Sequence, residues 1–499
     1  MPDTPASTYR PVLIWLVAAT FVVILNETIM MNALPSLMAA FHVSETTVQW
    51  LSTGFMLTMA VVIPTTGWFL QRVGTRTAFA AAMGVFSAGT LLAALAWSFP
   101  VLVAGRVVQA GGTAIMMPLL MTTLMTIVPP EHRGAVMGSV TLAISVAPAL
   151  GPTVSGVILD LASWRAIFWV VLPIALVISA LGLRNLRDVG VRGAASIDVL
   201  SVVLAALGFG FLVYGLSQMG DASKAVVNPW LAVALGAAGV AVFAWRQIAL
   251  QRREAPLLDL RTLRSGRFVL CLAVMGAAFM ALMGVMILLP LYLQNVRGVG
   301  VLETGLLMMP GGLAMGLLGP VVGRLFDRHG ARPLVVPGAI AILAALAGFT
   351  RVTTSTPLWM ILALHVAMTA ALAFAFTPVF TVGLGALPTR LYSHGSSMLG
   401  TLQQLAAAAG AAMVVAVMSS QARDLASQGK SLHEAMAGGM RWAFALDVAI
   451  GIGLVAMAFF LPGKEANAGH GHGHAQQDAA DEAGPDLDPE PTGAPGHTA

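Results

Sequence analysis

The sequence has few charged residues. Asp, Glu, Lys and Arg make up 10% of its 499 residues, whereas soluble domains carry about 25%. Hydrophobic residues make up 58%, and the mean hydropathy is +0.85. Apolar runs of the ~20 residues that cross a bilayer recur along nearly the whole chain, in place of the ~10-residue alternating segments of a membrane barrel. The composition excludes a soluble domain and predicts an all-α polytopic membrane protein.

Cysteine is almost absent, and this limits the chemistry further. The lone Cys271 excludes a disulfide framework within the chain and a cysteine-based metal cluster. The net charge of +4 and the pI near 9.6 are compatible with nucleic-acid binding. In a membrane protein, however, cytoplasmic loops explain a basic excess better, so we expect no nucleic-acid partner.

Motifs for catalysis or ATP hydrolysis are also lacking. The tripeptide GKS at 429–431 has Asp424 where a P-loop needs glycine. GIGLVA at 451–456 formally fits a dinucleotide motif but lies inside an apolar run. There is no H-E-x-x-H, and no polar segment between the apolar runs is long enough for a catalytic domain. We therefore expect neither an enzyme nor an ATP-driven pump, and no cofactor other than a proton gradient.

The apolar runs predict about fourteen membrane helices. The first run continues past Glu27 to Pro35 without an A-x-A cleavage site, so we interpret it as a retained helix rather than a signal peptide. The predicted helices cover 11–35, 50–70, 77–97, 101–127, 135–159, 165–183, 197–217, 229–249, 268–293, 303–323, 333–350, 358–384, 396–419 and 441–461.

The distribution of basic residues predicts the orientation. With both termini in the cytoplasm, 18 Lys and Arg residues fall in cytoplasmic segments and 7 in outside segments. Because positive residues favour the cytoplasmic side, we expect a multi-pass protein of the cytoplasmic membrane with both ends inside.

The chain divides into five predicted regions. They are a cytoplasmic N-terminus (1–10), a six-helix bundle (11–190), two additional membrane helices (191–255), a second six-helix bundle (256–461) and a disordered cytoplasmic tail (462–499). The tail contains GHGHGH, so His470, His472 and His474 could chelate a divalent metal. The alternative is a solvated tail with incidental metal affinity.

A loop sequence occurs twice. GWFLQRVGTR at 67–76 and GRLFDRHGAR at 323–332 share the pattern G-x-x-x-[QD]-R-x-G-x-R. Each joins two helices on the predicted cytoplasmic side, and such parallel repeats are typical of transporters built from two rocking halves. The 256 positions between the repeats exceed the usual length of six helices, and the two additional helices account for the difference.

This loop resembles the signature of the major facilitator superfamily. Three other stretches are similar to motifs of its fourteen-helix drug:proton antiporter (multidrug efflux) branch: RVVQAGGTA at 106–114, APALGPTVSG at 147–156 and LNETIMMNALP at 25–35. The resemblance covers residues ~10–460. It implies a major facilitator fold of two six-helix bundles plus two extra helices, and alternating access between the halves.

Several positions depart from the motifs of that branch. Gln71 stands where the loop motif has Asp, although Asp327 keeps it in the second repeat. Ala147 and Ser155 replace two glycines of the antiporter motif. In the first helix Asn26 stands at the position of the acid and Glu27 follows it, which turns the carboxylate about 100° around the helix.

Two ionisable residues inside membrane helices are the main candidates for proton coupling. A carboxylate near mid-bilayer costs roughly 2.5–3.5 kcal/mol, and burial favours its neutral form. Glu27 could therefore exchange protons, and a cationic substrate would compete with the proton. The alternative is a structural acid paired permanently with a neighbouring helix. Arg106 shares a helix face with Gln109 and Thr113, and the resemblance implies that it tunes the proton site. Alternatively, its side chain snorkels to the outer interface.

Other polar or flexible residues in the helices are weaker candidates. Asp447 is either an outer-end charge paired with Arg441 or a second acid in the pathway. His365 could titrate near neutral pH, but a buried histidine is more often simply hydrogen-bonded. Methionines suit a promiscuous binding surface, although they also serve in ordinary packing. The predicted substrate-binding residues are Asn26, Asn32, Gln109, Thr113, Met116, Met117, His365, Gln403 and Gln404.

The repeated loop and the fifth helix are candidates for gating. We expect the loop residues to latch the cytoplasmic side by pairing with one another or with helix ends, more weakly in the first repeat because Gln71 carries no charge. The alternative is a pure topology signal. The resemblance implies that Gly151 and Pro152 seal the first helix against the fifth. The predicted gating residues are Gly67, Arg72, Gly74, Arg76, Gly151, Pro152, Gly323, Asp327, Arg328, Gly330 and Arg332.

The function that follows is proton-coupled export of lipophilic or cationic drugs across the cytoplasmic membrane. The antiporter-like motif and the helix count favour export through the resemblance, and uptake by a proton-coupled symporter on the same fold is the alternative. The expected partners are membrane lipid, protons and a drug-like small molecule. A periplasmic adaptor protein is a further candidate if the cell has two membranes.

Overall fold

The computed structural model describes residues 6–186, 188, 198–219, 227–252 and 256–463, with the side chains of 6–9, 31, 32, 45, 46, 152 and 301 excepted. Its elements are helices throughout the described part, where 14 of them are long and apolar enough to cross a membrane. The prediction of an all-α polytopic protein is confirmed. His470, His472 and His474 lie outside the described residues.

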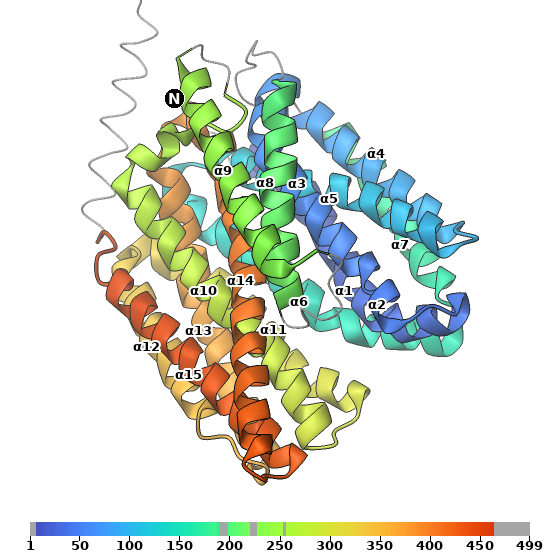
Figure 1. Cartoon of the computed structure of the whole chain (residues 1–499). Helices are drawn as coiled ribbons and strands as arrows, with labels where there is room; N and C mark the ends of the chain where they lie inside the picture. Colours follow the sequence, from blue (N-terminus) through green and yellow to red (C-terminus); the bar gives the residue numbers. More distant parts are fainter. Residues whose placement is uncertain (1–5, 187, 189–197, 220–226, 253–255, 464–499) are drawn as a thin grey trace, which may run out of the picture.

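The first six membrane helices form the N-terminal half (Figure 1). They are α1 (Ala6–Phe41), α3 (Trp50–Val73), α4 (Thr75–Ala94), α5 (Phe99–Ile127), α6 (Arg133–Leu161) and α7 (Arg165–Asn185), with the short α2 (Glu45–Val48) between α1 and α3. In this half α4 packs against α5 and α7, and α1 packs against α5, α6 and α7.

The last six membrane helices form the C-terminal half. They are α10 (Gly266–Leu291), α11 (Val301–His329), α12 (Arg332–Phe349), α13 (Leu358–Gly385), α14 (Tyr392–Ser427) and α15 (Leu432–Ala458). Short helical turns precede α6 (Pro130–His132), α10 (Leu260–Arg264) and α14 (Thr389–Leu391), and a wider turn (Tyr292–Val296) follows α10.

Two pairs of helices make the most extensive contacts between the halves. α6 packs along α11, and α3 packs along α14. Since α3 and α11 carry the two copies of the repeated loop, these contacts correspond to each other. The additional helices α8 (Val199–Gln218) and α9 (Pro229–Gln251) form a hairpin, of which α8 packs on both α3 and α14. In Figure 1 this hairpin, coloured green, lies over the junction of the two halves.

We call the side of the bundle where α1 begins and α15 ends the terminal face, and the other side the distal face. Both repeated loops lie at the terminal face. Each contains a glycine with a left-handed backbone, Gly74 with φ 78° and Gly330 with φ 83°, a conformation that favours glycine. The sharp turn that this allows brings α4 directly after α3 and α12 directly after α11.

Several helices extend beyond their predicted ends. α14 covers Tyr392–Ser427 rather than 396–419, and α15 begins at Leu432 rather than 441. Arg423, which follows the predicted helix 396–419, therefore lies within α14. The extensions are polar, so hydropathy does not indicate them. A capping box of Ser431 and Glu434 starts α15 by satisfying backbone N–H groups of its first turn.

Candidate transport site and gate

The acidic segment of α1 lies at the contact of α1 with α5 and α6. Asn26 is 0% exposed, and neither atom of its side-chain amide has a hydrogen-bond partner. Glu27, the next residue, is partly exposed. The sequence predicted a substrate-binding residue at Asn26 and a proton-coupling acid at Glu27. In the structure Asn26 is fully buried, whereas Glu27 is partly exposed. The side chain of Asn32 is outside the described part.

Arg106 on α5 is held by neighbours from three helices. Its side chain is 2% exposed, so the alternative in which it snorkels to the interface is wrong. One guanidinium nitrogen donates to Oε1 of Gln109 at 2.6 Å, and Nε2 of Gln109 donates to the hydroxyl of Thr90 on α4 at 2.8 Å. The guanidinium carbon lies 4.2 Å from the ring centroid of Phe55 on α3, within the range of a cation–π interaction.

Glu27 and Arg106 are brought together by the contact of α1 with α5. The two side chains interact electrostatically, although among the described residues no ion pair within 4.0 Å joins them. Because Gln109 and Phe55 already engage the guanidinium, Arg106 keeps partners whether Glu27 is charged or neutral. These two contacts are neutral, and Nε of Arg106 has no hydrogen-bond partner, so Glu27 is the residue that can balance the charge of Arg106 electrostatically.

The other predicted residues of α5 are mostly packed. Gln109 and Thr113 are buried, and the Thr113 hydroxyl donates to the Gln109 carbonyl oxygen at 3.1 Å. Met116 is a fully buried member of the main hydrophobic core, and Met117 is partly buried against it. In the conformation described here, Met116 is therefore a packing residue.

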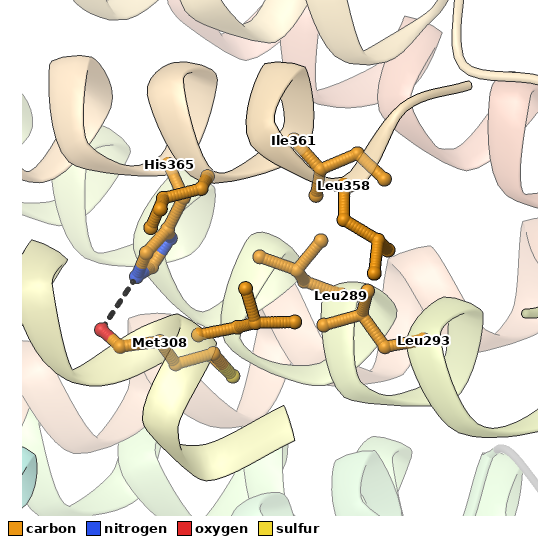
Figure 2. Close-up of a pocket in the computed structure, with 8 residues that line it drawn as sticks. Leu289, Leu293, Met308, Leu358, Ile361 and His365 are labelled. Carbon is orange, nitrogen blue, oxygen red and sulfur yellow. Dashed lines mark hydrogen bonds between the residues drawn. The ribbon is translucent and has the colours of Figure 1, made fainter. Parts of the chain in front are cut away.

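In the C-terminal half, His365 lies beside a small apolar pocket near the distal face. Figure 2 shows the imidazole directed at α11, where its Nε2 lies 3.3 Å from the carbonyl oxygen of Met308. The imidazole is buried, and its Nδ1 has no hydrogen-bond partner. The remaining lining is aliphatic, with Leu289 and Leu293 from α10 and the following turn.

The two glutamines of α14 differ in their contacts. Nε2 of Gln404 donates to the sulfur of Met59 on α3 at 3.9 Å, across the junction of the halves. Nε2 of Gln403 is buried without a partner. Both are partly exposed, so they offer polar groups beside the helix pair that joins the halves.

Asp447 lies in the interior of the C-terminal half. It is 0% exposed, and neither carboxylate oxygen has a hydrogen-bond partner. Arg441 is exposed, and its Nε donates to the carbonyl oxygen of Thr350 at 2.9 Å. The predicted pairing of Asp447 with Arg441 is therefore wrong, because six residues along a helix turn the second side chain about 240° from the first.

Asp327 connects the two halves at the terminal face. Its carboxylate accepts hydrogen bonds from the backbone N–H groups of Gly134 and Ala135, both at 2.8 Å. These groups lie in the first turn of α6, where N–H groups have no partner within the helix and the helix dipole favours an anion. The second copy of the loop thus pairs with a helix end, one of the contacts expected for a latch.

The first copy of the loop makes a weaker equivalent contact. Nε2 of Gln71 donates to the carbonyl oxygen of Arg390, just before α14, at 2.8 Å. This bond is neutral, because Gln71 replaces the acid. The arginines of both loops, Arg72, Arg76, Arg328 and Arg332, have exposed side chains.

Close backbone contact accompanies both loop contacts. A Cβ on Gly323 would overlap the carbonyl of Gly134, and one on Gly67 would come within 2.7 Å of Nδ1 of His394 on α14. Gly151 of α6 packs in the same way against Thr28 of α1. The side chain of Pro152 is outside the described part. Small residues of this kind allow helices to approach closely in a membrane.

Hydroxyl pairs strengthen the contact between the halves. They join Thr66 with Ser397 at 2.7 Å, Thr122 with Ser396 at 2.8 Å and Thr141 with Thr377 at 2.9 Å. All lie toward the terminal face. Sequence reasoning missed them, together with His394, Phe55 and Thr90, because each pairing depends on how two helices are rotated. Among the described residues, no group of three or more His, Cys, Asp or Glu side chains is placed to hold a metal ion.

Comparisons with known proteins agree with this architecture. The family described as Major Facilitator Superfamily matches residues 16–411. The MFS-type transporter YcnB of Bacillus subtilis, described as uncharacterized, is 38% identical over 88% of this chain and 92% of its own length. The lincomycin resistance protein LmrB of Listeria monocytogenes is 37% identical over 82% of this chain and 86% of its own length.

Solved structures show the same fold at low sequence identity. The human organic anion transporter MFSD10 (TETRAN) matches with a TM-score of 0.66 at 14% identity, over 91% of this chain and 100% of its own. The proton:xylose symporter XylE, bound to 6-bromo-6-deoxy-D-glucose, matches with a TM-score of 0.63 at 16% identity, over 92% of this chain and 97% of its own.

Proposed function

The chain belongs to the major facilitator superfamily and is a multi-pass membrane transporter, and from this premise we propose that it exports lipophilic or cationic drugs in exchange for protons. The observation that carries the proposal is the placement of Glu27. Glu27 is a partly exposed residue inside a membrane helix, and its carboxylate interacts electrostatically with the buried Arg106.

Competition for Glu27 supplies the coupling. A bound cation stabilises the carboxylate, whereas a bound proton removes the charge that attracts the cation. Arg106 favours the carboxylate when the site is empty, and its bonds to Gln109 and Phe55 persist when Glu27 is protonated. Substrate and proton therefore occupy the site in turn, which is the minimum requirement for exchange.

The gate supports alternating access. Asp327, Gln71 and the three hydroxyl pairs hold the halves together toward the terminal face. On the positive-inside distribution of Lys and Arg, this face is cytoplasmic. In this proposal the structure represents the state that is closed to the cytoplasm, and export requires these contacts to break before the substrate enters.

The direction of transport rests on the relatives. LmrB of Listeria monocytogenes is named as a lincomycin resistance protein, which supports removal of toxic compounds rather than uptake of a nutrient. The driving force is sufficient, since about 2.3 kcal/mol per charge is available from 100 mV and about 1.4 kcal/mol from each pH unit. For a neutral drug, one proton then maintains a gradient of roughly a few hundredfold. Exchange of a monovalent cation for one proton moves no net charge, so only the pH difference drives it, and the gradient is roughly tenfold for each pH unit.

Transport by the purified protein in liposomes tests the proposal. The expected result is that an imposed proton gradient drives uptake of tetraphenylphosphonium against the flow of protons, and that Glu27→Gln abolishes this coupled uptake. Glu303→Gln is the matched control, because Glu303 is an exposed carboxylate at the start of α11. Movement of the cation in the same direction as the protons would instead show symport.

A further inference from the structure

Asp447 is a buried acid outside the coupling site described above. Both of its carboxylate oxygens lie against the backbone of α10, where a Cβ placed on Gly284 would come within 2.8 Å of Oδ1 and closer still to Oδ2. The carboxylate is fully buried and lacks hydrogen-bond partners. This close fit depends on glycine at position 284.

The residues one turn before and one turn after Asp447 pack against apolar groups of α12. One turn before it, Phe444 stacks on Phe349 of α12 at 5.1 Å between ring centroids. One turn after it, Gly451 packs against Leu343 of α12. An ionised carboxylate in such surroundings has nothing to replace its lost water.

No nearby charged group is placed to balance the charge that Asp447 would carry when ionised. Among the described residues, no hydrogen bond or electrostatic interaction connects Asp447 with another ionisable side chain. The charged or titratable side chains on α10, α12 and α14, with the nearest one on α15, are Arg267, Cys271, Arg332, Tyr392, His394, Arg423, Asp424 and Arg441, and Tyr292 lies in the turn after α10.

The C-terminal end of α10 has two features that allow the helix to bend. Pro290 is the penultimate residue of α10, and the wide turn Tyr292–Val296 interrupts the regular hydrogen bonding that follows. Such interruptions are common where helices bend. Leu289 and Leu293, on either side of Pro290, line the pocket in Figure 2. A bend at Pro290 would therefore change access to this pocket.

We propose that Asp447 is a second proton-binding site, and that its protonation holds α10 against α15. When the proton leaves to water, the carboxylate must be hydrated, and α10 moves away from α15 to admit that water. The link to transport rests on the proton-driven function proposed above, whereas the change in packing does not. The site lies in the opposite half from Glu27, so each half would respond to its own proton.

Thiol labelling of the full-length protein in lipid nanodiscs tests this switch. The substitution Cys271→Ala removes the only cysteine of the sequence. Leu293→Cys then places a single thiol beside the bend, at a position where the leucine is 1% exposed. The rate of labelling by N-ethylmaleimide is measured between pH 6 and 9 with and without Asp447→Asn. The ratio of the two rates at each pH cancels the intrinsic reactivity of the thiol.

The expected ratio is near one at pH 6 and rises at least fivefold by pH 9, because only the protein with Asp447 can ionise and release α10. A ratio that does not change with pH would overturn the proposal. His365 lines the same pocket, so the measurement is repeated with His365→Asn. Loss of the rise in that variant would assign the effect to the histidine and would also overturn it.

A second variant keeps the proposal testable if Asp447→Asn does not fold. Gly284→Ala forces the carboxylate and α10 apart, so labelling at pH 6 should already exceed that of the parent at least fivefold. Equal rates would contradict the proposal. Glu27→Gln in the same background separates the two sites: it should abolish proton-coupled transport and leave the pH-dependent labelling unchanged.

Discussion

Replacing Asp327 by Asn tests whether the contact between α11 and α6 holds the terminal face closed. The carboxylate accepts two backbone hydrogen bonds at 2.8 Å from Gly134 and Ala135. Hydrogen bonds to charged groups contribute about 1.5–3 kcal/mol each, and an anion at a helix N-terminus adds about 0.3–1 kcal/mol. Asn keeps one neutral acceptor and loses the charge. Because Asp327 is only partly buried and desolvation of its carboxylate offsets much of these gains, we expect the closed state to lose about 1–2 kcal/mol.

A change of this size is measurable as a shift in population. About 1–2 kcal/mol corresponds to a roughly 5- to 30-fold change in the equilibrium constant. Spin labels at positions 139 and 324, which are exposed on α6 and α11, report the separation of the halves by double electron–electron resonance in a Cys271→Ala background. Asp327→Asn should increase the fraction at the longer distance.

The matched control is Gln71→Ala in the first copy of the loop. Gln71 contributes one neutral hydrogen bond to Arg390, worth about 0.5–1.5 kcal/mol and less at an exposed site. The shift should therefore be several times smaller than that of Asp327→Asn. If Asp327→Asn leaves the distance distribution unchanged, or shifts it no more than Gln71→Ala, the latch assigned to Asp327 is wrong.

Two further substitutions test the packing and the attachment of the additional helices. Gly151→Ala should reduce transport at least tenfold, because a Cβ there overlaps Thr28, whereas Gly156→Ala should have no effect, since nothing lies within 4 Å of that position. Asp198 caps α8 and binds Arg246 at 2.7 Å, and these bonds lower the pKa of Asp198 to about 2. The stability that ionised Asp198 contributes is therefore complete above its ordinary pKa of 3.8 and is lost as the pH falls toward 2. The difference in melting temperature between wild type and Asp198→Asn should consequently shrink below pH 4.

The number and order of the membrane helices could be predicted because a bilayer requires long apolar runs. The helix ends could not, because α14 and α15 continue into polar sequence that hydropathy does not distinguish from a loop. The capping box of Ser431 and Glu434 is the one local signal that would have placed the start of α15 correctly.

The sequence identified the candidate site residues of each helix separately, but not the contacts between helices. Glu27 and Arg106 each stand out as ionisable residues in an apolar run, and the resemblance linked them. Phe55 and Thr90 were missed, since an aromatic or hydroxyl side chain is common in a membrane helix and only the rotation of α3 and α4 directs these two at α5. The pairing of Asp447 with Arg441 failed for a related reason: proximity in sequence does not place two residues on one helix face.

Proton release on substrate binding tests the central claim most directly. The purified protein in weakly buffered detergent solution is mixed with tetraphenylphosphonium, and the released protons are recorded with a pH-sensitive dye. If Glu27 is shared by proton and substrate, binding releases protons from the wild type and from Glu303→Gln, and releases none from Glu27→Gln. Equal release by Glu27→Gln and wild type would contradict the account.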